Sequence, residues 1–209
     1  LEKNPFRYYK MKVDRTNVKV PLTKEELETL IHKPLPNDRL ARIRDVFSFC
    51  CLTGLAFTDV DHLRREHITT DEDGTQWIHK PREKTAVMSR VPLLPHPIAL
   101  LRKYERDETC RARGKLLPVP SNAKMNAYLK ELADICGIRK RLSTHTARHT
   151  FATLILASGA TLYNAGTLQY EHDPPLCPNP RFIHYAGHAD RSQSDGSVNR
   201  TVSEGHERP

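Results

Sequence analysis

Apolar residues recur at three- and four-residue spacing through most of the first 160 positions, and a two-residue period replaces this spacing in one segment at 68–94. The first spacing predicts helices that bury one face, and the second predicts strands. We therefore expect a mainly α fold with one small antiparallel β-sheet (α+β). The expected helices span 24–31, 38–53, 58–63, 97–106, 121–136 and 145–158, and the expected strands span 76–80 and 89–93.

Short polar signals mark the ends of these helices. The segment T-K-E-E at 23–26 is a capping box, in which the hydroxyl and the second glutamate each bond a free backbone N–H group. Gly54 is expected to end the second helix. Thr58 and Thr144 are expected to serve as N-caps, because a threonine hydroxyl accepts from the free N–H groups of a first helical turn.

The last quarter of the chain has a different character. Residues 163–209 contain four arginines, no lysine and six acidic residues, a net charge of −2, which leaves +10 for residues 1–162. Helix-breaking prolines also gather there, at Pro174, Pro175, Pro178 and Pro180. We expect one compact domain at 21–162, followed by a divergent and poorly ordered segment at 163–209.

The net charge of +8 over 209 residues favours a polyanionic partner, because lysines and arginines displace counterions from a phosphate backbone. There is no run of about 18 apolar residues and no signal-peptide pattern, so we expect a cytoplasmic protein without membrane contact. The odd set of five cysteines has no C-x-x-C pair, which predicts reduced thiols. We expect neither a metal nor a cofactor.

The most informative segment is H-T-A-R-H-T-F-A-T at 145–153. His145 and Arg148 are three residues apart, so they share one face of the first helical turns. A helix N-terminus with a guanidinium and an imidazole can hold a phosphate. The alternative is a capped core helix whose basic residues are only solvated, and spacing alone does not separate the two interpretations.

Three segments together resemble a known family in their order and spacing. They are L-T-G-L-A-F-T-D-V at 52–60, P-R-E-K-T at 81–85 in a hairpin that closes on V-P-L-L at 91–94, and the 145–153 string. In these residues the chain resembles the catalytic domain of tyrosine recombinases (phage integrases), most of all mobile-element integrases of Bacteroides-type bacteria. The resemblance covers about residues 20–162, and it implies that residues 1–20 are a linker from a missing N-terminal core-binding domain.

The resemblance assigns a role to individual positions. Arg148 matches the second arginine of the family's pair, which holds the scissile phosphate, and His145 matches a histidine that donates to the same phosphate. Lys84 matches the lysine that protonates the 5′-oxygen leaving group. Arg82 and His149 are expected to contact DNA beside them. Without the resemblance, Lys84 would be interpreted as an exposed hairpin lysine.

Two departures from the family pattern matter. Ala56 occupies the position of the first catalytic arginine, although Asp59 retains the acidic position that follows. Some integrases of the Bacteroides group also lack that arginine. The later L-G-H turn and nucleophile segment are not recognisable, and only His172 and Tyr185 lie in weak echoes of them. We therefore hypothesise that the coding sequence is altered near residue 162, for example by a frameshift.

The resemblance implies site-specific DNA recombination or integration through a phosphotyrosyl intermediate, by an enzyme that needs no cofactor. The expected partners are double-stranded DNA and other recombinase protomers, in a tetrameric synapse. The main alternative is a degenerate fragment that binds DNA without cutting it. A helical DNA-binding regulator outside this family fits the charge but not the ordered motifs. His184 and His188 have a spacing seen in metal ligands, but a glycine between them in a proline-rich tail favours solvated histidines.

Overall fold

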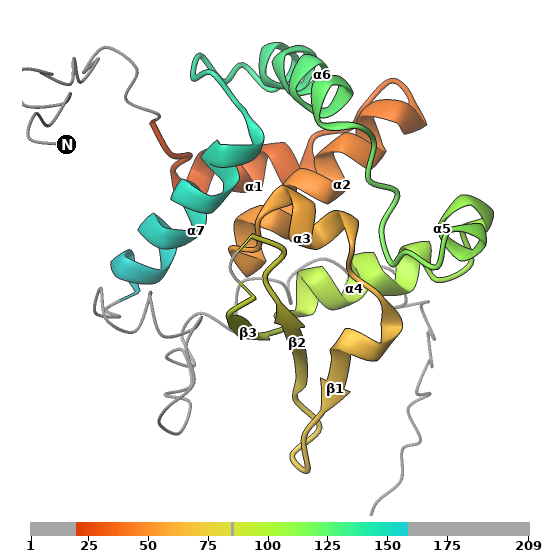
Figure 1. Cartoon of the computed structure of the whole chain (residues 1–209). Coiled ribbons are helices and arrows are strands. Elements are labelled where there is room, and N and C mark those ends of the chain that lie inside the picture. The colour runs from red at the N-terminus through yellow and green to blue at the C-terminus, as the bar shows by residue number, and fades with distance from the viewer. Residues whose placement is uncertain (1–19, 85, 159–209) are drawn as a thin grey trace, which may run out of the picture.

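The computed structural model describes residues 20–84 and 86–158 (Figure 1). Seven α-helices, one 3₁₀ turn and a three-stranded sheet follow one another in these ranges. In chain order they are α1 (Lys24–His32), α2 (Asp38–Thr53), α3 (Phe57–Asp61), η2 (Arg65–His67), β1 (Ile68–Thr70), β2 (Gln76–Pro81), β3 (Met88–Pro92), α4 (Pro95–Tyr104), α5 (Glu108–Ala112), α6 (Asn122–Ile135) and α7 (Thr144–Ala157). The predicted fold class, mainly α with a small antiparallel sheet, is confirmed.

Helix α2 lies at the centre of the domain. Its second half is buried almost continuously, including Phe47, Phe49, Cys50 and Cys51. A helix that is buried on every side must be covered by neighbours. α2 packs against α1, α4, α6 and α7, as Figure 1 shows. Cys110 is also buried, so three of the cysteines in the described residues belong to the core.

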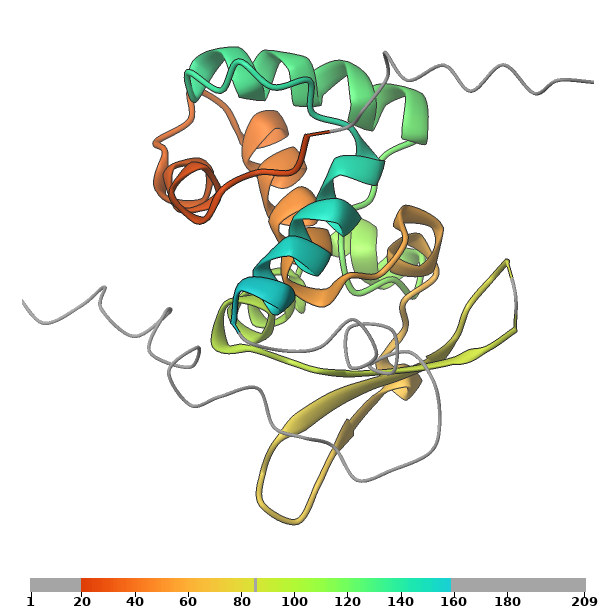
Figure 2. The same ribbon diagram turned by 90° about the vertical axis from the view of Figure 1, so that its left-hand side faces the viewer.

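The sheet has the order β1-β2-β3 with antiparallel pairing throughout. β2 and β3 form the predicted hairpin, in register from Trp77 opposite Pro92 to Pro81 opposite Met88. β1 is a third, short strand that was not predicted, and it pairs with the start of β2. Figure 2 shows the tip of the β2–β3 hairpin and α3 on the right-hand side of the molecule, while the strands themselves run across its lower half.

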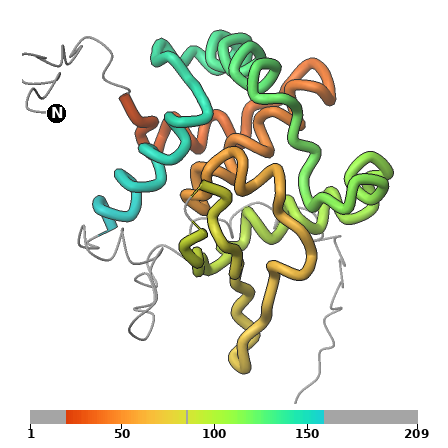
Figure 3. The backbone as a smooth tube through the Cα atoms, viewed as in Figure 1, coloured from red at the N-terminus to blue at the C-terminus, as the bar shows by residue number. Residues whose placement is uncertain are grey.

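The first described residues lie against the last helix. Leu22 N–H donates to Thr150 Oγ1 at 3.0 Å, and the same hydroxyl donates to Thr146 O one turn earlier in α7. Figure 3 shows this red segment next to α7. Lys140 adds a second tie, since its Nζ donates to Pro21 O and to the Glu26 carboxylate. The first described residues are therefore hydrogen-bonded to α7 and to the segment just before it.

Gly54 ends α2 as predicted, with a left-handed φ of 67°. A side chain at this position would collide with Phe151 of α7, because a Cβ built there lies only 2.3 Å from Cδ1 of the ring. Both the backbone conformation and the close approach of α7 therefore require glycine.

A buried carboxylate joins α2 to α4. Asp45 is 2% exposed and accepts hydrogen bonds from Lys103 Nζ at 2.6 Å, Tyr104 OH at 2.8 Å and Arg44 Nε at 3.0 Å. Burial by itself raises the pKa of Asp45, but these three bonds outweigh it and bring the pKa below its ordinary value of 3.8. The carboxylate is thus held in its charged form inside the domain.

Several predicted helix ends were wrong by one or two residues. Ala56, rather than Thr58, is the N-cap of α3 and makes no side-chain cap bond, so burial of neighbours such as Val60 fixes this helix start. Ser143, rather than Thr144, caps α7: the Ser143 hydroxyl accepts from Thr146 N–H, whereas the Thr144 hydroxyl donates to Asn122 Oδ1. α4 begins two residues earlier than predicted, at Pro95, since proline fits the first turn of a helix. α5 was not predicted at all.

Candidate functional site

The N-terminal turn of α7 is built by a reciprocal capping box. Ser143 Oγ accepts from Thr146 N–H, and Thr146 Oγ1 accepts from Ser143 N–H. The box fixes the helix start, so the face that carries His145 and Arg148 has a defined direction. His145 is exposed and Arg148 is partly buried one turn later, while His149 is exposed beside it. This end of α7 therefore carries two exposed histidines and one partly buried arginine.

Arg148 is the best-anchored member of this group. Its Nη1 donates to Gly54 O at 3.1 Å, which ties the guanidinium to the end of α2. The pKa of Arg148 lies below its ordinary value because partial burial and the nearby Arg82 guanidinium disfavour the charged form, while Asp59 opposes them. An anion bound here would remove part of this cost, which is the electrostatic condition for a phosphate site.

Ala56 lies two residues after Gly54, at the N-cap of α3, and is partly exposed. Its methyl group contributes no donor. The acidic residue three positions later is instead buried: Asp59 is 3% exposed and its Oδ1 accepts from Glu83 N–H at 2.9 Å. The first turn of α3 is thereby fastened to the turn between β2 and β3.

The same turn is held a second time through a side chain. Lys80 is 3% exposed, and its Nζ donates to Glu83 Oε1 at 2.6 Å and to Pro81 O at 3.2 Å. His62 Nδ1 lies 3.5 Å from the same Glu83 oxygen. The pKa of the Glu83 carboxyl is lowered, first by the hydrogen bond from Lys80. Glu83 is therefore clamped at its backbone by Asp59 and at its carboxylate by Lys80, and we call these three residues the turn clamp.

The turn clamp positions the two predicted hairpin residues on either side of Glu83. Lys84 is exposed at the tip of the turn. Arg82 is partly buried, and its Nε donates to Ser89 Oγ at 3.2 Å across the hairpin. Arg82 and Asp59 are the charged groups that act on the pKa of Arg148. The structure thus brings Arg82, Asp59 and Arg148 into one electrostatic neighbourhood, with Ala56 on the connecting segment.

The remaining predicted site residues divide into two groups. Convergence of Lys84, His145 and His149 on the Arg148 neighbourhood stays a prediction, although His145 and His149 lie on the same helix as Arg148. His172 and Tyr185 lie outside the described residues, as do residues 1–19 of the predicted linker and the predicted tail at 163–209.

Sequence reasoning missed the turn clamp. Lys80 is two residues after the buried Ile78 in a strand, so alternation placed its side chain on the buried face. A lysine on a buried face needs a carboxylate partner, and Glu83 is the acidic residue within reach in the following turn. The sequence therefore contains a signal for the Lys80–Glu83 pair, but the signal can be used only once it is known which residues of the strand face the core.

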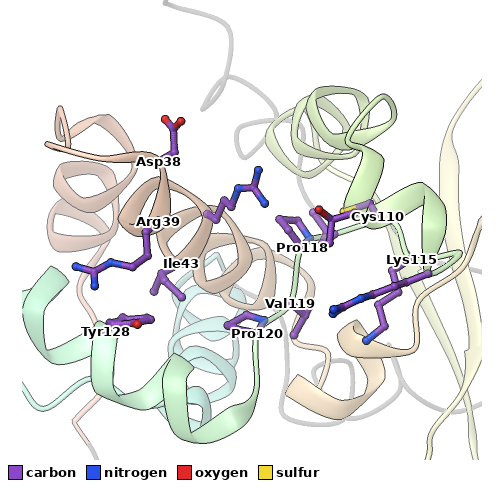
Figure 4. A pocket seen from close by; sticks show the side chains of 13 residues that line it. Asp38, Arg39, Ile43, Cys110, Lys115, Pro118, Val119, Pro120 and Tyr128 are labelled. Atoms are coloured by element: carbon purple, nitrogen blue, oxygen red, sulfur yellow. The ribbon is translucent and has the colours of Figure 1, made fainter.

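A cavity of about 440 Å³ lies elsewhere, between α2, α5 and α6 (Figure 4). Arg39 extends over the Tyr128 ring there, 4.4 Å from its centroid. Three of its basic residues are already paired, Arg39 with Glu131, Arg42 with Asp107 and Lys115 with Asp61. None of the residues that line it belongs to the candidate site.

Two further searches cover only the described part of the chain. No group of three or more histidine, cysteine or acidic side chains is placed there to hold a metal ion. No helix in 20–84 or 86–158 is long and apolar enough to cross a membrane.

Known proteins share sequence similarity with this chain over most of the described residues. The model of the phage integrase family matches residues 21–165. The tyrosine recombinase XerC of Syntrophus aciditrophicus is 26% identical over 165 residues, which cover 71% of this chain and 52% of that protein. XerD of Pseudomonas putida is 26% identical over 167 residues, covering 73% and 55%.

A solved structure of the Tn1549 transposon integrase in complex with transposon right-end DNA has a similar fold. Its TM-score is 0.58 at 15% identity, and the match covers 83% of this chain and 65% of that chain. The tyrosine-recombinase-like fold predicted for the central domain is therefore confirmed. The chain spans about half the length of the curated relatives that it matches.

Proposed function

The chain belongs to the phage integrase family, and from this premise we propose that it takes part in site-specific DNA recombination or integration as a tyrosine-type recombinase. The observation that carries the proposal is the anchoring of Arg148. A guanidinium at the start of a capped helix, partly buried and with its pKa lowered, is suited to hold one phosphate of a DNA backbone.

We assign the following roles at that phosphate. Arg148 and His145 donate hydrogen bonds to its non-bridging oxygens and stabilise the charge that develops in the transition state. Lys84 transfers a proton to the 5′-oxygen as it leaves. Arg82 and His149 contact the flanking backbone. The turn clamp supports the Lys84 assignment, because it fastens the adjacent residue to α3.

The reaction conserves the phosphodiester bond energy. A tyrosine oxygen attacks the phosphorus, the bond to the 5′-oxygen breaks, and a 3′-phosphotyrosyl link and a free 5′-hydroxyl result. The 5′-hydroxyl of a partner strand later attacks that link and releases the tyrosine. No metal or nucleotide is needed for this balance. Tyr185 is the proposed nucleophile and His172 the proposed second histidine.

Ala56 and the lack of a recognisable nucleophile segment in the sequence favour a second candidate function, a degenerate recombinase that binds DNA without cutting it. Removal of one donor from an anionic transition state costs about 3 to 4 kcal/mol, or roughly two to three orders of magnitude in rate. Loss of the nucleophile leaves no residual cleavage. Binding depends only on the basic side chains, which both functions share.

The proposal extends to partners and origin. Double-stranded DNA is the substrate, and other protomers on the same DNA complete a tetrameric synapse. We also propose a specific kinship with Bacteroides-type mobile-element integrases, since some integrases of that group likewise lack the arginine at the position of Ala56. A DNA substrate in bacteria would place the protein in the cytoplasm, at the nucleoid.

A suicide substrate separates the two candidate functions. This DNA carries a nick beside the cleavage site, so that cleavage releases a short strand and traps the covalent link. A recombinase leaves a protein–DNA adduct on denaturing electrophoresis, and Tyr185→Phe abolishes it. A binding-only chain retards the same DNA on a native gel but leaves no adduct. Absence of both signals, over DNA substrates from candidate attachment sites, would refute the proposed function.

A further inference from the structure

We infer that Lys80 is a positioning residue of the phosphate site: it holds the Glu83 carboxylate in an ion pair, so that this carboxylate does not neutralise Lys84. The inference rests on the proposed function, in which Lys84 acts at the scissile phosphate. It adds to that function a buried residue that acts through its neighbours in the turn and contacts neither the DNA nor the reacting atoms.

Lys80 occupies a strand position that faces the domain interior. It follows Ile78 by two residues in β2, so both side chains lie on the same face of the strand, and Lys80 is 3% exposed. A buried ammonium is costly unless it is paired and hydrogen-bonded. Its Nζ donates to Glu83 Oε1 at 2.6 Å and to Pro81 O at 3.2 Å. Both bonds go to the turn, so this lysine serves the turn rather than a ligand in solvent.

The partner, Glu83, is held at both its side chain and its backbone. The pKa of its carboxyl is lowered, first by the hydrogen bond from Lys80 and then by the charge of the same lysine, so the ionised form is favoured. His62 Nδ1 lies 3.5 Å from the carboxylate oxygen that Lys80 binds. The Glu83 N–H group donates to Asp59 Oδ1. The negative charge of Glu83 is therefore kept on the side of the turn that β2 and α3 form.

Loss of Lys80 would release this carboxylate next to Lys84. Consecutive Cα atoms are about 3.8 Å apart, so the long side chains of Glu83 and Lys84 can meet at the tip of the turn. In the structure Lys84 is exposed, and within the described ranges it forms no ion pair. A released Glu83 would attract the Lys84 ammonium and repel a DNA phosphate. Lys80 thus keeps the positive charge of Lys84 available without contributing a contact of its own.

The salt dependence of DNA binding tests this role, because the slope of log affinity against log salt follows the number of phosphates that the protein neutralises. Fluorescence anisotropy of the whole chain with a short labelled duplex measures the slope at pH 8, where histidine side chains carry little charge. We expect Lys84→Ala to reduce the slope by about one. Lys80→Met should also reduce it by about one, although Lys80 is buried, because the released carboxylate cancels one cation.

A double variant separates this role from a purely structural one. Lys80→Met combined with Glu83→Gln removes both charges of the pair, so the slope should return to the wild-type value. Lys115→Met is the matched control. It breaks another lysine–carboxylate pair, with Asp61 of α3, and should leave the slope unchanged, since Asp61 is not adjacent in the chain to a proposed phosphate contact.

Thermal melts identify a variant that is unfolded at the assay temperature. If Lys80→Met is unfolded there, Lys80→Gln takes its place, because the glutamine amide can donate to Pro81 O while Glu83 is still left without a cation. A wild-type slope in the folded single variant would overturn the inference. A reduced slope that the double variant does not restore would overturn it as well, since the effect would then come from distortion of the turn.

The wild-type chain and Lys84→Ala keep the two proposals apart. If the wild-type chain binds the duplex and Lys84→Ala lowers the slope, but Lys80→Met does not, only the role of Lys80 fails. If Lys84→Ala leaves the slope unchanged, the assignment of Lys84 fails together with the role of Lys80. If the wild-type chain does not bind the duplex at all, the proposed function itself fails.

Discussion

Gly54 and Arg148 are joined by a hydrogen bond of 3.1 Å between the carbonyl oxygen of the glycine and Nη1 of the arginine. Phe151, one turn after Arg148, lies against the same glycine on the side where a side chain would be. α7 therefore touches the end of α2 through two residues of one face. The position of the guanidinium depends on how closely the two helices approach.

Replacement of Gly54 by alanine should separate these helices. A left-handed backbone costs a non-glycine residue about 1–2 kcal/mol, and overpacking against the Phe151 ring adds roughly 1–3 kcal/mol. We expect Gly54→Ala to lower the free energy of unfolding by about 2–5 kcal/mol in urea titrations. Gly137→Ala is the control, because Gly137 has nearly the same φ, 68°, but nothing within 4 Å of an added Cβ. Equal losses in both variants would show that Phe151 contributes nothing.

Removal of the Asp59 carboxylate should loosen the turn that carries Arg82 and Lys84. Asp59→Ala deprives Glu83 N–H of its acceptor, so amide hydrogen exchange at Glu83 should become about tenfold faster or more, as expected for loss of one partly buried hydrogen bond. Asp61→Ala, on the same helix, removes the pairs with Lys115 and His62 but keeps the acceptor of Glu83 N–H, so it should leave exchange at Glu83 nearly unchanged. Unchanged exchange in Asp59→Ala would mean that the turn holds itself.

Acid should weaken the domain through Asp45. The pKa of this carboxyl is lowered in the folded state, so its stabilising contribution is present above the ordinary value of 3.8 and is lost as the pH falls below it. Asp45→Asn should destabilise the protein at pH 6 by about 3 kcal/mol and should lose less stability than wild type between pH 5 and pH 3. Glu72→Gln, at an exposed turn position, should follow the wild-type profile. Identical acid slopes in Asp45→Asn and wild type would refute this.

Duplex DNA should bind weakly at low salt and dissociate steeply as salt rises, because the affinity comes mainly from counterion release. Arg148→Ala should reduce the slope of log affinity against log salt by about one, with a modest loss of affinity, since the other basic residues remain. Lys130→Ala, an exposed lysine on α6, should leave the slope unchanged. Fluorescence anisotropy at several salt concentrations measures both quantities. A slope that is the same in Arg148→Ala as in wild type would remove Arg148 from the interface.

Helix positions and the hairpin followed from apolar periodicity, because burial of one face leaves a regular pattern in the chain. Helix starts were less predictable. Thr58 has the right side chain for a cap, yet packing sets the start of α3 at Ala56. α5 escaped prediction because its five residues are too short to show a period, although Asp107 caps it.

The residues of the candidate site could also be predicted only in part. His145, Arg148 and Lys84 lie in contiguous strings, so their sequence context was enough to select them. The Asp59–Glu83 bond joins residues 24 positions apart, and no local pattern encodes such a pairing. The neighbourhood of Arg82 and Arg148 is likewise a product of how α7, α3 and the hairpin pack.

The hydrogen bond from Leu22 to Thr150 joins residues 128 positions apart, so the ribosome synthesises the two partners several seconds apart. At a translation rate of about 5–20 residues per second, roughly 6 to 26 seconds pass between the appearance of the first partner and that of the second. For most of that interval α2 has been made but α7, which packs against it, is not complete. The nascent chain therefore displays an apolar surface on the ribosome, where a chaperone can bind it until α7 arrives.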